Sequence, residues 1–305
     1  MSISYQHTTV LLNEAVEQLI TRPDGVYIDA TCGLGGHSEE IAKHLHKNAK
    51  LIAFDLDPLA LEFAKKRLDF FNNVHFIQNN FAKIKMELIS RNIESFDGIL
   101  YDLGVSSLEI DSAERGFSFM QDGPLDMRMG QTDLSAADVI NTYSQDELTR
   151  IFREYGEERF SGRIARVIVE TRPYYRTLPL VNCIKTVVHG KYVTKTLARI
   201  FQALRIEVNQ ELESIKKSIS DAIDMLNPGG RIVVISFHSL EDRIVKNLFH
   251  EASIDCVCPP EIPVCVCNHK AVAKKITRKP IIPSEDEIKN NSRSRSAKCR
   301  VLEKL

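Results

Sequence analysis

The chain has 305 residues, of which 43% are hydrophobic and 27% are charged, and its formal net charge at pH 7 is −1. This composition predicts a folded protein with a sizeable core in one or two domains and excludes a disordered chain. No apolar stretch approaches the roughly 20 residues that span a bilayer, and the N-terminus lacks a basic and apolar leader. Because seven cysteines also argue against a disulfide framework, we expect a cytoplasmic protein with no membrane partner.

Short apolar runs alternate with amphipathic segments along the chain. Runs typical of buried parallel strands occupy Val26–Ala30, Lys50–Asp55, Val74–Gln78, Phe96–Asp102 and Arg231–Phe237. Helical spacing of apolar residues covers Glu39–Leu45 and Pro58–Leu68. The alternation predicts an α/β fold with a doubly wound, mostly parallel sheet of the Rossmann-like type.

The first predicted strand runs into a glycine-rich turn, Gly33-Leu-Gly35-Gly36-His37-Ser38, at the start of a helix. Glycines let the backbone turn sharply, and the helix N-terminus attracts negative charge. Asp55 closes the second strand, where a carboxylate suits a ribose diol. The pattern predicts a nucleoside-cofactor site, shared by nicotinamide enzymes and methyltransferases. A dinucleotide fingerprint has a third glycine where this chain has Ser38, which disfavours a nicotinamide oxidoreductase.

The fourth predicted strand ends at Asp102, followed by Leu103, Gly104 and Val105. This loop lies at the same edge of the sheet as the glycine turn, where the acceptor should meet the cofactor. In a methyltransferase acting on a base amine, Asp102 and the carbonyl of Leu103 would accept hydrogen bonds from the amine. The Pro-Pro-aromatic loop of DNA amino methyltransferases is absent. The alternative interpretation is that Asp102 is a helix cap or a loop acid.

The alternation of strands and helices breaks after residue 104. The interval of about 125 residues before the strand at Arg231 is too long for one crossover helix. We therefore predict a core at 1–104 and 205–305 that carries the sheet, interrupted by an inserted helical domain at 105–204. Glu207–Leu226 is predicted as the crossover helix, stopped by Asn227-Pro-Gly-Gly230.

Basic residues are concentrated in two segments. Residues 159–205 hold ten Lys or Arg against one acid, Glu170, and residues 268–300 hold ten against three. Arg163 and Arg166 are spaced to share a helix face, and Arg199 lies on a second basic stretch. A solvated helix face normally mixes acids with bases, so we predict that these three arginines bind RNA phosphates.

Four of the cysteines form two Cys-x-Cys pairs, Cys256 with Cys258 and Cys265 with Cys267. They are compatible with a tetrathiolate zinc site, although Cys-x-x-Cys is the usual spacing, and equally with the buried face of a hairpin. Both interpretations stay open, and no metal ligand is assigned. His238, at the end of the last predicted strand, is as consistent with a structural role as with a catalytic one.

With these motifs in view, the chain resembles the bacterial S-adenosylmethionine-dependent methyltransferases that modify the N4 amine of a cytidine in small-subunit (16S) ribosomal RNA. The stretches that carry the resemblance are His7–Leu12, Gly33–Ser38, Asp102–Ser107, Glu114–Phe119, Gly123–Arg128, Tyr155–Phe160, Phe201–Ile206 and Ile235–Arg243. They imply a class I methyltransferase core interrupted by a helical substrate-recognition domain, which agrees with the insertion predicted at 105–204. They also imply a substrate within partly or fully assembled small subunits.

The resemblance also implies the residues that contact S-adenosylmethionine: Gly35, Gly36, His37, Asp55, Phe81, Asp102 and Glu109. Glu109 stands where the family pattern has glutamine, and a carboxylate accepts a hydrogen bond but cannot donate one. Phe81 is also consistent with a core position. The rival functions are a DNA amino methyltransferase, a nicotinamide oxidoreductase and a noncatalytic RNA-binding factor that keeps the fold.

Overall fold

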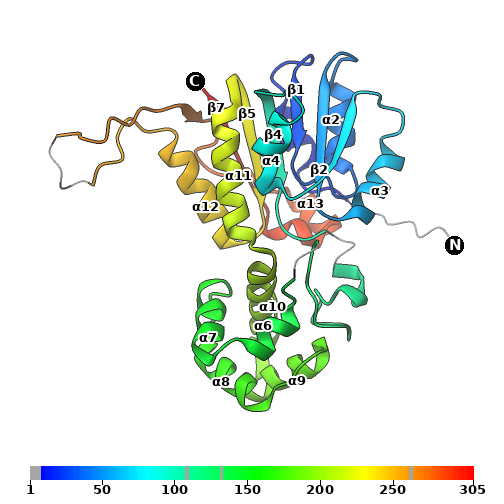
Figure 1. The fold of residues 1–305 in the computed structure, drawn as a ribbon, viewed down its shortest axis with the longest axis vertical. Helices are drawn as coiled ribbons and strands as arrows, with labels where there is room; N and C mark the ends of the chain where they lie inside the picture. The colour runs from blue at the N-terminus through cyan, green and yellow to red at the C-terminus, as the bar shows by residue number, and fades with distance from the viewer. Residues whose placement is uncertain (1–7, 107–109, 131–132, 260, 262–263) are drawn as a thin grey trace. The chain divides into compact units, whose positions relative to one another are not determined.

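The computed structural model describes residues 8–106, 110–130, 133–259, 261 and 264–305. Internal contacts divide the chain into two compact units (Figure 1). The sheet unit comprises residues 1–104 and 212–305, and the helical unit comprises residues 105–211. The predicted end of the insertion, at residue 204, falls inside helix α10 (Val193–Asn209). That helix stays whole because Asn209, near its end, binds the backbone of Met127 and Met129 within the helical unit.

The sheet unit is built on a sheet whose described strands follow the order β3-β2-β1-β4-β5-β7-β6. Their bounds are β1 (Val26–Asp29), β2 (Lys50–Asp55), β3 (Val74–Gln78), β4 (Phe96–Asp102), β5 (Leu226–Ser236), β6 (Ala273–Lys275) and β7 (Lys298–Lys304). Strands β1 to β5 are parallel, while β7 runs antiparallel to β5 and β6. The strand order reverses beside β1, so the carboxyl ends of β1 and β4 border the crevice where open α/β sheets bind ligands.

Helices cover both faces of this sheet. One face is covered by α1 (Leu12–Leu19), α2 (Gly36–His44) and α3 (Pro58–Arg67), and the other by α4 (Ile84–Ile89), α11 (Glu211–Met225) and α12 (Ser239–Glu251). Alternate strand residues serve the two faces: Tyr27 and Val233 pack with α1, whereas Ile28 and Val234 pack with α11. The remaining short helices are η1 (Phe81–Lys83), α13 (Glu285–Asn290) and η4 (Ser292–Ser296).

The helical unit has its own apolar core. Besides α10 it contains η2 (Ala113–Arg115), α6 (Ala136–Thr142), α7 (Gln145–Glu154), α8 (Ser161–Thr171), α9 (Thr177–Val187) and η3 (Gly190–Tyr192). Two of these helices begin at capping boxes, in which Ser135 pairs with Asp138 and Ser144 with Glu147. These reciprocal hydrogen bonds satisfy backbone donors that a helix start otherwise leaves open.

The predicted doubly wound sheet is confirmed, with two local differences. Strand β5 begins at Leu226, so the predicted stop at Asn227–Gly230 lies within the strand. Leu226 pairs with Phe96 and Arg231 with Gly98, and the four intervening residues form a bulge. Strands β6 and β7 were not predicted, because their basic residues hide the apolar pattern.

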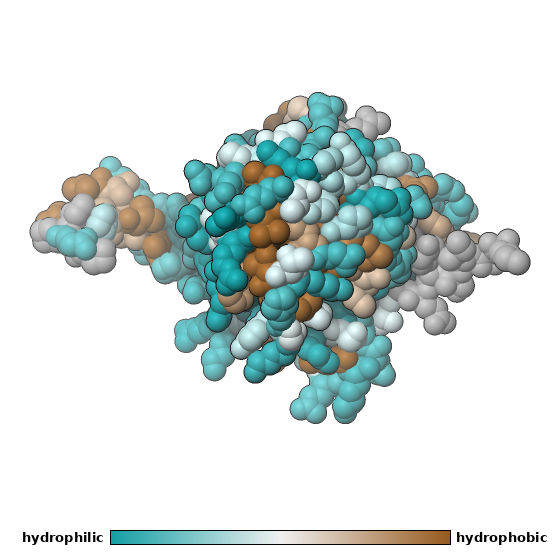
Figure 2. Space-filling view, turned by 90° about the horizontal axis from the view of Figure 1, so that it is seen from below, coloured by the Kyte–Doolittle hydropathy of each residue, from teal (hydrophilic) through white to brown (hydrophobic). Residues whose placement is uncertain are grey.

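Between α12 and β6 the described residues 254–259, 261 and 264–271 form a long arm that projects from the sheet unit (Figures 1 and 2). Within the described ranges, no helix is both long enough and apolar enough to cross a membrane.

Candidate active site

The glycine turn joins the end of β1 to the start of α2. Gly33 and Gly35 have positive φ angles of 52° and 81°, a region that side chains other than glycine's rarely adopt. A Cβ atom on Gly36 would lie 2.0 Å from the Thr9 hydroxyl oxygen. The backbone therefore favours glycine at Gly33 and Gly35, and a side chain at Gly36 would have to displace the Thr9 side chain. The turn brings the open backbone N–H groups of the α2 N-terminus to the carboxyl edge of the sheet.

Asp29, the last residue of β1, anchors this turn. Its carboxylate accepts hydrogen bonds from the Ser38 hydroxyl at 2.6 Å and from the Thr31 backbone N–H at 3.2 Å. Burial raises the pKa of Asp29 to about 6. From the sequence, Ser38 is notable only as a missing glycine; in the structure it holds α2 to the first strand.

Asp55, at the end of β2, lies against the same turn. One carboxylate oxygen accepts from the Gly33 N–H at 2.7 Å, and the other accepts from the Asp57 N–H at 2.9 Å. Burial raises the pKa of Asp55 to about 6. Each oxygen keeps a second lone pair, so the half-buried carboxylate retains acceptors for a pair of ligand hydroxyls.

Asp102, at the end of β4, is held beside the turn by a hydrogen bond from its backbone N–H. Its N–H donates to the Thr31 hydroxyl at 2.6 Å, and its Oδ2 lies 3.6 Å from His37 Nδ1. The other oxygen, Oδ1, is buried and has no hydrogen-bond partner among the described residues. Burial, followed by the nearby charges of Asp29 and Glu241, raises the pKa of Asp102 well above its usual range.

His37 lies in the first turn of α2 and is almost fully buried. Its Nε2 is 3.1 Å from the Val10 carbonyl oxygen, which fits an N–H donor at that nitrogen. In the neutral ring Nδ1 is then an acceptor, and it faces the Asp102 carboxyl at 3.6 Å, which is longer than a hydrogen bond.

The end of β5 completes this edge of the sheet unit. The Glu241 carboxylate accepts from the backbone N–H groups of Phe237 at 2.8 Å and His238 at 3.2 Å. His238 caps α12, and its Nε2 lies 3.1 Å from the other Glu241 oxygen. Gly104 has a φ of 102°, and a Cβ there would lie 3.5 Å from the Phe237 ring. Phe237, to which the sequence analysis assigns no role of its own, thus places an aromatic ring beside the loop after β4.

Two further residues, Phe81 and Glu109, are predicted to contact the cofactor. Phe81 begins η1 after β3, and its ring meets Tyr101 edge-on with centroids 5.9 Å apart. The ring is half-buried against the sheet core, so part of it serves packing. Glu109 lies outside the described residues, and its contact with the cofactor stays a prediction.

The three predicted RNA-binding arginines lie in the helical unit in unlike surroundings. Arg163, exposed on α8, stacks 5.9 Å from the Phe160 ring, and Arg166 on the same helix pairs with Glu170 at 2.8 Å. Arg199 on α10 instead lies 3.5 Å from the carboxylate of Glu158, which is almost fully buried. Arg199 therefore neutralises a buried acid rather than presenting a solvated cation.

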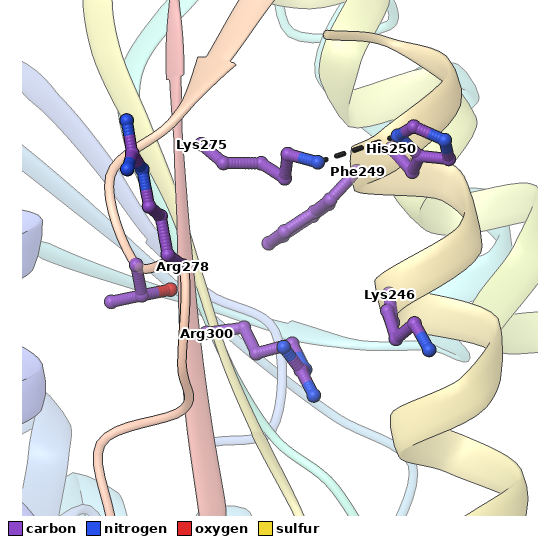
Figure 3. Close-up of a pocket in the computed structure, with 7 residues that line it drawn as sticks. Lys246, Phe249, His250, Lys275, Arg278 and Arg300 are labelled. Atoms are coloured by element: carbon purple, nitrogen blue, oxygen red, sulfur yellow. Dashed lines mark hydrogen bonds between the residues drawn. The ribbon is translucent and has the colours of Figure 1, made fainter.

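A separate basic cavity of about 260 Å³ lies in the sheet unit between α12 and the strands β6 and β7 (Figure 3). Its lining residues are Lys246, Phe249, His250, Lys275, Thr277, Arg278 and Arg300. Arg300 is paired with Asp242 at 2.6 Å. Lys246, Lys275 and Arg278 have no carboxylate partner in the described part of the chain, so the cavity carries net positive charge.

Residues 4–305 match the model of the MraW methylase family. The chain belongs to this family. Proteins named ribosomal RNA small subunit methyltransferase H, from Clostridioides difficile and Caldicellulosiruptor saccharolyticus, are each 50% identical to it, over 99% of this chain and 100% of theirs. A solved rRNA methylase from Streptococcus thermophilus aligns over 95% of this chain and 92% of its own, with 12% identity and a TM-score of 0.43.

Membership in the MraW methylase family confirms the resemblance that the motifs indicated and makes the protein a methyltransferase. The edge of the sheet built from Asp29, Asp55 and Asp102 around the glycine turn is the candidate active site. Its acceptors are grouped where a methyl donor and an amine would meet in this fold.

Proposed function

We propose that the protein transfers a methyl group from S-adenosylmethionine to the N4 amine of a cytidine in small-subunit ribosomal RNA. The names of its full-length relatives and the sequence motifs support the substrate class. The observation that carries the chemistry is Asp102 beside the glycine turn, a half-buried carboxyl group whose Oδ1 is buried and has no hydrogen-bond partner among the described residues. The reaction takes place in the cytoplasm, on partly or fully assembled small subunits.

The residues around the turn fit S-adenosylmethionine. The open N–H groups at the start of α2 suit the carboxylate of its methionine part, and Asp55 has lone pairs left for the ribose hydroxyls. Gly35 and Gly36 have no side chains, so a ligand can approach the backbone closely at this point. When bound, the cofactor supplies a methyl group already activated on a sulfonium.

Asp102 is the proposed acceptor for the cytosine amine. An amine conjugated with its ring is a poor nucleophile, so its alignment with the methyl group dominates the rate. An ionised Asp102 accepts a hydrogen bond from the amine, stabilises the positive charge that grows on nitrogen and takes the proton late. The raised pKa of Asp102 strengthens its basicity once it is ionised.

Phe237 is the proposed neighbour of the target base. Its ring lies against Gly104, in the loop that follows Asp102, and the ring is half-buried. A flat apolar side chain at this point suits a base that has been unstacked from the RNA. Phe237 would thus supply the aromatic ring that the loop after Asp102 lacks.

Two basic surfaces are proposed to bind RNA phosphates. The helical unit offers Arg163 and Arg166, which are exposed on one helix. The sheet unit offers the basic cavity, which Lys246, Lys275 and Arg278 help to line and whose volume of about 260 Å³ is large enough for a phosphate group (Figure 3). Arg163 and the three cavity cations have no acidic partner among the described residues, and such groups release counterions when they meet a polyanion. Arg166 would exchange its partner Glu170 for a phosphate.

Methyl transfer from radiolabelled S-adenosylmethionine tests the substrate class. We expect label in undermethylated small ribosomal subunits and little label in naked ribosomal RNA or DNA. Preferential labelling of DNA would instead favour the DNA amino methyltransferase, and cofactor binding with no label in any substrate would favour the noncatalytic RNA-binding factor. Binding of a nicotinamide cofactor in place of S-adenosylmethionine would favour the oxidoreductase.

A further inference from the structure

The arm between α12 and β6 is held at its base but has no apolar core of its own among its described residues. At the base, the backbone N–H groups of Val272 and Ala273 donate to the Ala252 carbonyl, and the Ala271 N–H donates to Asp255. Farther out, the side chains of Val264 and Val266 are about 70% exposed, and the space-filling view shows apolar residues on the arm (Figure 2). Burial therefore does not explain how the two limbs of the arm, residues 254–259 and 264–271, stay together.

Four thiols converge between these limbs. The Sγ atoms of Cys256, Cys258, Cys265 and Cys267 all lie within 4.8 Å of one another. Cys267 is 3.5 Å from Cys265 and 3.9 Å from Cys256, measured between sulfurs. Residues two apart on an extended chain point to the same side, so each Cys-x-Cys pair presents both thiols to the opposite limb.

The surroundings of the sulfurs match those of metal-bound thiolates. The Val266 N–H lies 3.4 Å from Cys258 Sγ, and the Val257 N–H lies 3.5 Å from Cys267 Sγ. Such backbone contacts orient and stabilise thiolate ligands from outside the metal's own shell. The hairpin interpretation, with a buried cysteine face, is wrong for this arm because Cys256 and Cys265 are exposed.

We propose that these four cysteines bind one zinc ion that ties the two limbs of the arm together. A tetrahedral site with Zn–S bonds of about 2.3 Å places its sulfurs about 3.8 Å apart, within the range of separations in the arm. All four ligands are thiolates and none of the positions is left for water, so the site is structural. Each thiol releases its proton on binding, and the affinity for zinc therefore falls as the pH is lowered.

Metal analysis of the untagged, full-length protein tests the site. We expect about one zinc per chain after purification without chelators, and loss of at least nine-tenths of it in the Cys258→Ser/Cys265→Ser double variant. Cys183→Ser is the matched control, because Cys183 is buried in the core of the helical unit, and it should keep the full zinc content. Zinc that persists in the double variant would overturn the assignment.

Thiol reactivity in the wild-type protein provides a test that needs no variant. With zinc bound, the four arm thiols should react with a disulfide reagent only after a strong chelator is added. Co²⁺ exchanged into the protein should give the visible bands of a tetrahedral thiolate site. Four thiols that react at once in zinc-supplemented protein, with no cobalt spectrum, would contradict the proposal.

Discussion

At the scale of single residues, the three aspartates at the sheet edge differ in how many hydrogen bonds their carboxylate oxygens accept from the protein. Asp29 accepts from Ser38 and Thr31, and both Asp55 oxygens accept from backbone N–H groups. Asp102 alone of these three keeps a buried oxygen without a described partner. An unsatisfied buried acceptor costs stability, which supports the proposal that Asp102 binds a ligand that brings a donor.

Replacing this carboxyl tests the role directly. We expect Asp102→Asn to lower kcat by roughly 10² to 10⁴-fold, because the amide keeps the size of the side chain but cannot take a proton. Cofactor affinity, measured by calorimetry, should change by no more than a few-fold. A variant with normal turnover would remove Asp102 from the chemistry. Asn72→Asp, at an exposed position before β3, is the control for handling and folding.

Asp29 supplies a prediction about stability and pH. Its folded pKa of about 6 lies above the usual value of 3.8, so the stabilisation from its neutral form is fully present below pH 3.8. This stabilisation is lost as the pH rises through about 6. Asp29→Asn removes the titration, and its free energy of unfolding relative to the wild type should rise by about 1 kcal/mol between pH 5 and pH 7.5. Urea unfolding at both pH values measures this difference, and parallel pH profiles would contradict it.

At this scale, roles could be predicted from the sequence where they follow from a residue's place in a strand. Asp55 and Asp102 each end an apolar run, and parallel strands bring such ends to one edge. Ser38 and Phe237 were missed because their roles depend on contacts between segments distant in the chain. Ser38 meets Asp29 across the turn, and Phe237 meets Gly104 from the neighbouring strand. No local pattern encodes either contact.

At the scale of elements, helix α8 presents the exposed basic face of the helical unit. We expect Arg163→Ala/Arg166→Ala to weaken RNA binding and to reduce the slope of log K against log salt by about 0.7 for each phosphate that is no longer neutralised. Cofactor affinity should not change. Fluorescence binding titrations at several salt concentrations measure the slope.

The matched control for that experiment is Lys216→Ala/Lys217→Ala on α11. These lysines are adjacent, exposed and paired with Glu213 and Asp221, much as Arg166 is paired with Glu170. An unchanged slope in the arginine variant, or an equal reduction in the control, would exclude α8 from the RNA interface. Lys275→Ala/Arg278→Ala applies the same test to the basic cavity.

The prediction for Arg199 concerns stability and not RNA binding, although the sequence analysis groups it with Arg163 and Arg166. Its partner Glu158 is almost fully buried and also accepts from Thr196 and the Phe160 backbone. Arg199→Ala leaves that carboxylate without its cation and should destabilise the protein by about 1–2 kcal/mol. Thermal unfolding should show a lower Tm than for Arg163→Ala; equal Tm values would return Arg199 to the RNA-binding set.

At the scale of the whole molecule, a mostly parallel sheet carries the candidate cofactor site and a separate helical unit is inserted after β4. The break in strand spacing predicted an insertion, because no crossover helix accounts for so long an interval. The helical unit ends at residue 211, later than the predicted residue 204, because the sequences of α10 and α11 form a nearly continuous helical pattern. Gln210, in the left-handed conformation with φ 49°, separates the two helices, and a single such residue leaves no clear sequence signal.

Transfer of the methyl group to N4 of a cytidine in small-subunit ribosomal RNA is the conclusion on which the proposed roles of the site residues depend. Its sharpest test treats undermethylated small subunits with the protein and S-adenosylmethionine carrying an isotopically heavy methyl group, and then identifies the labelled nucleoside by mass spectrometry. We expect heavy N4-methylated cytidine with the wild-type protein and almost none with Asp102→Asn. Heavy label at a ring carbon, on a ribose or on another base would contradict this reaction.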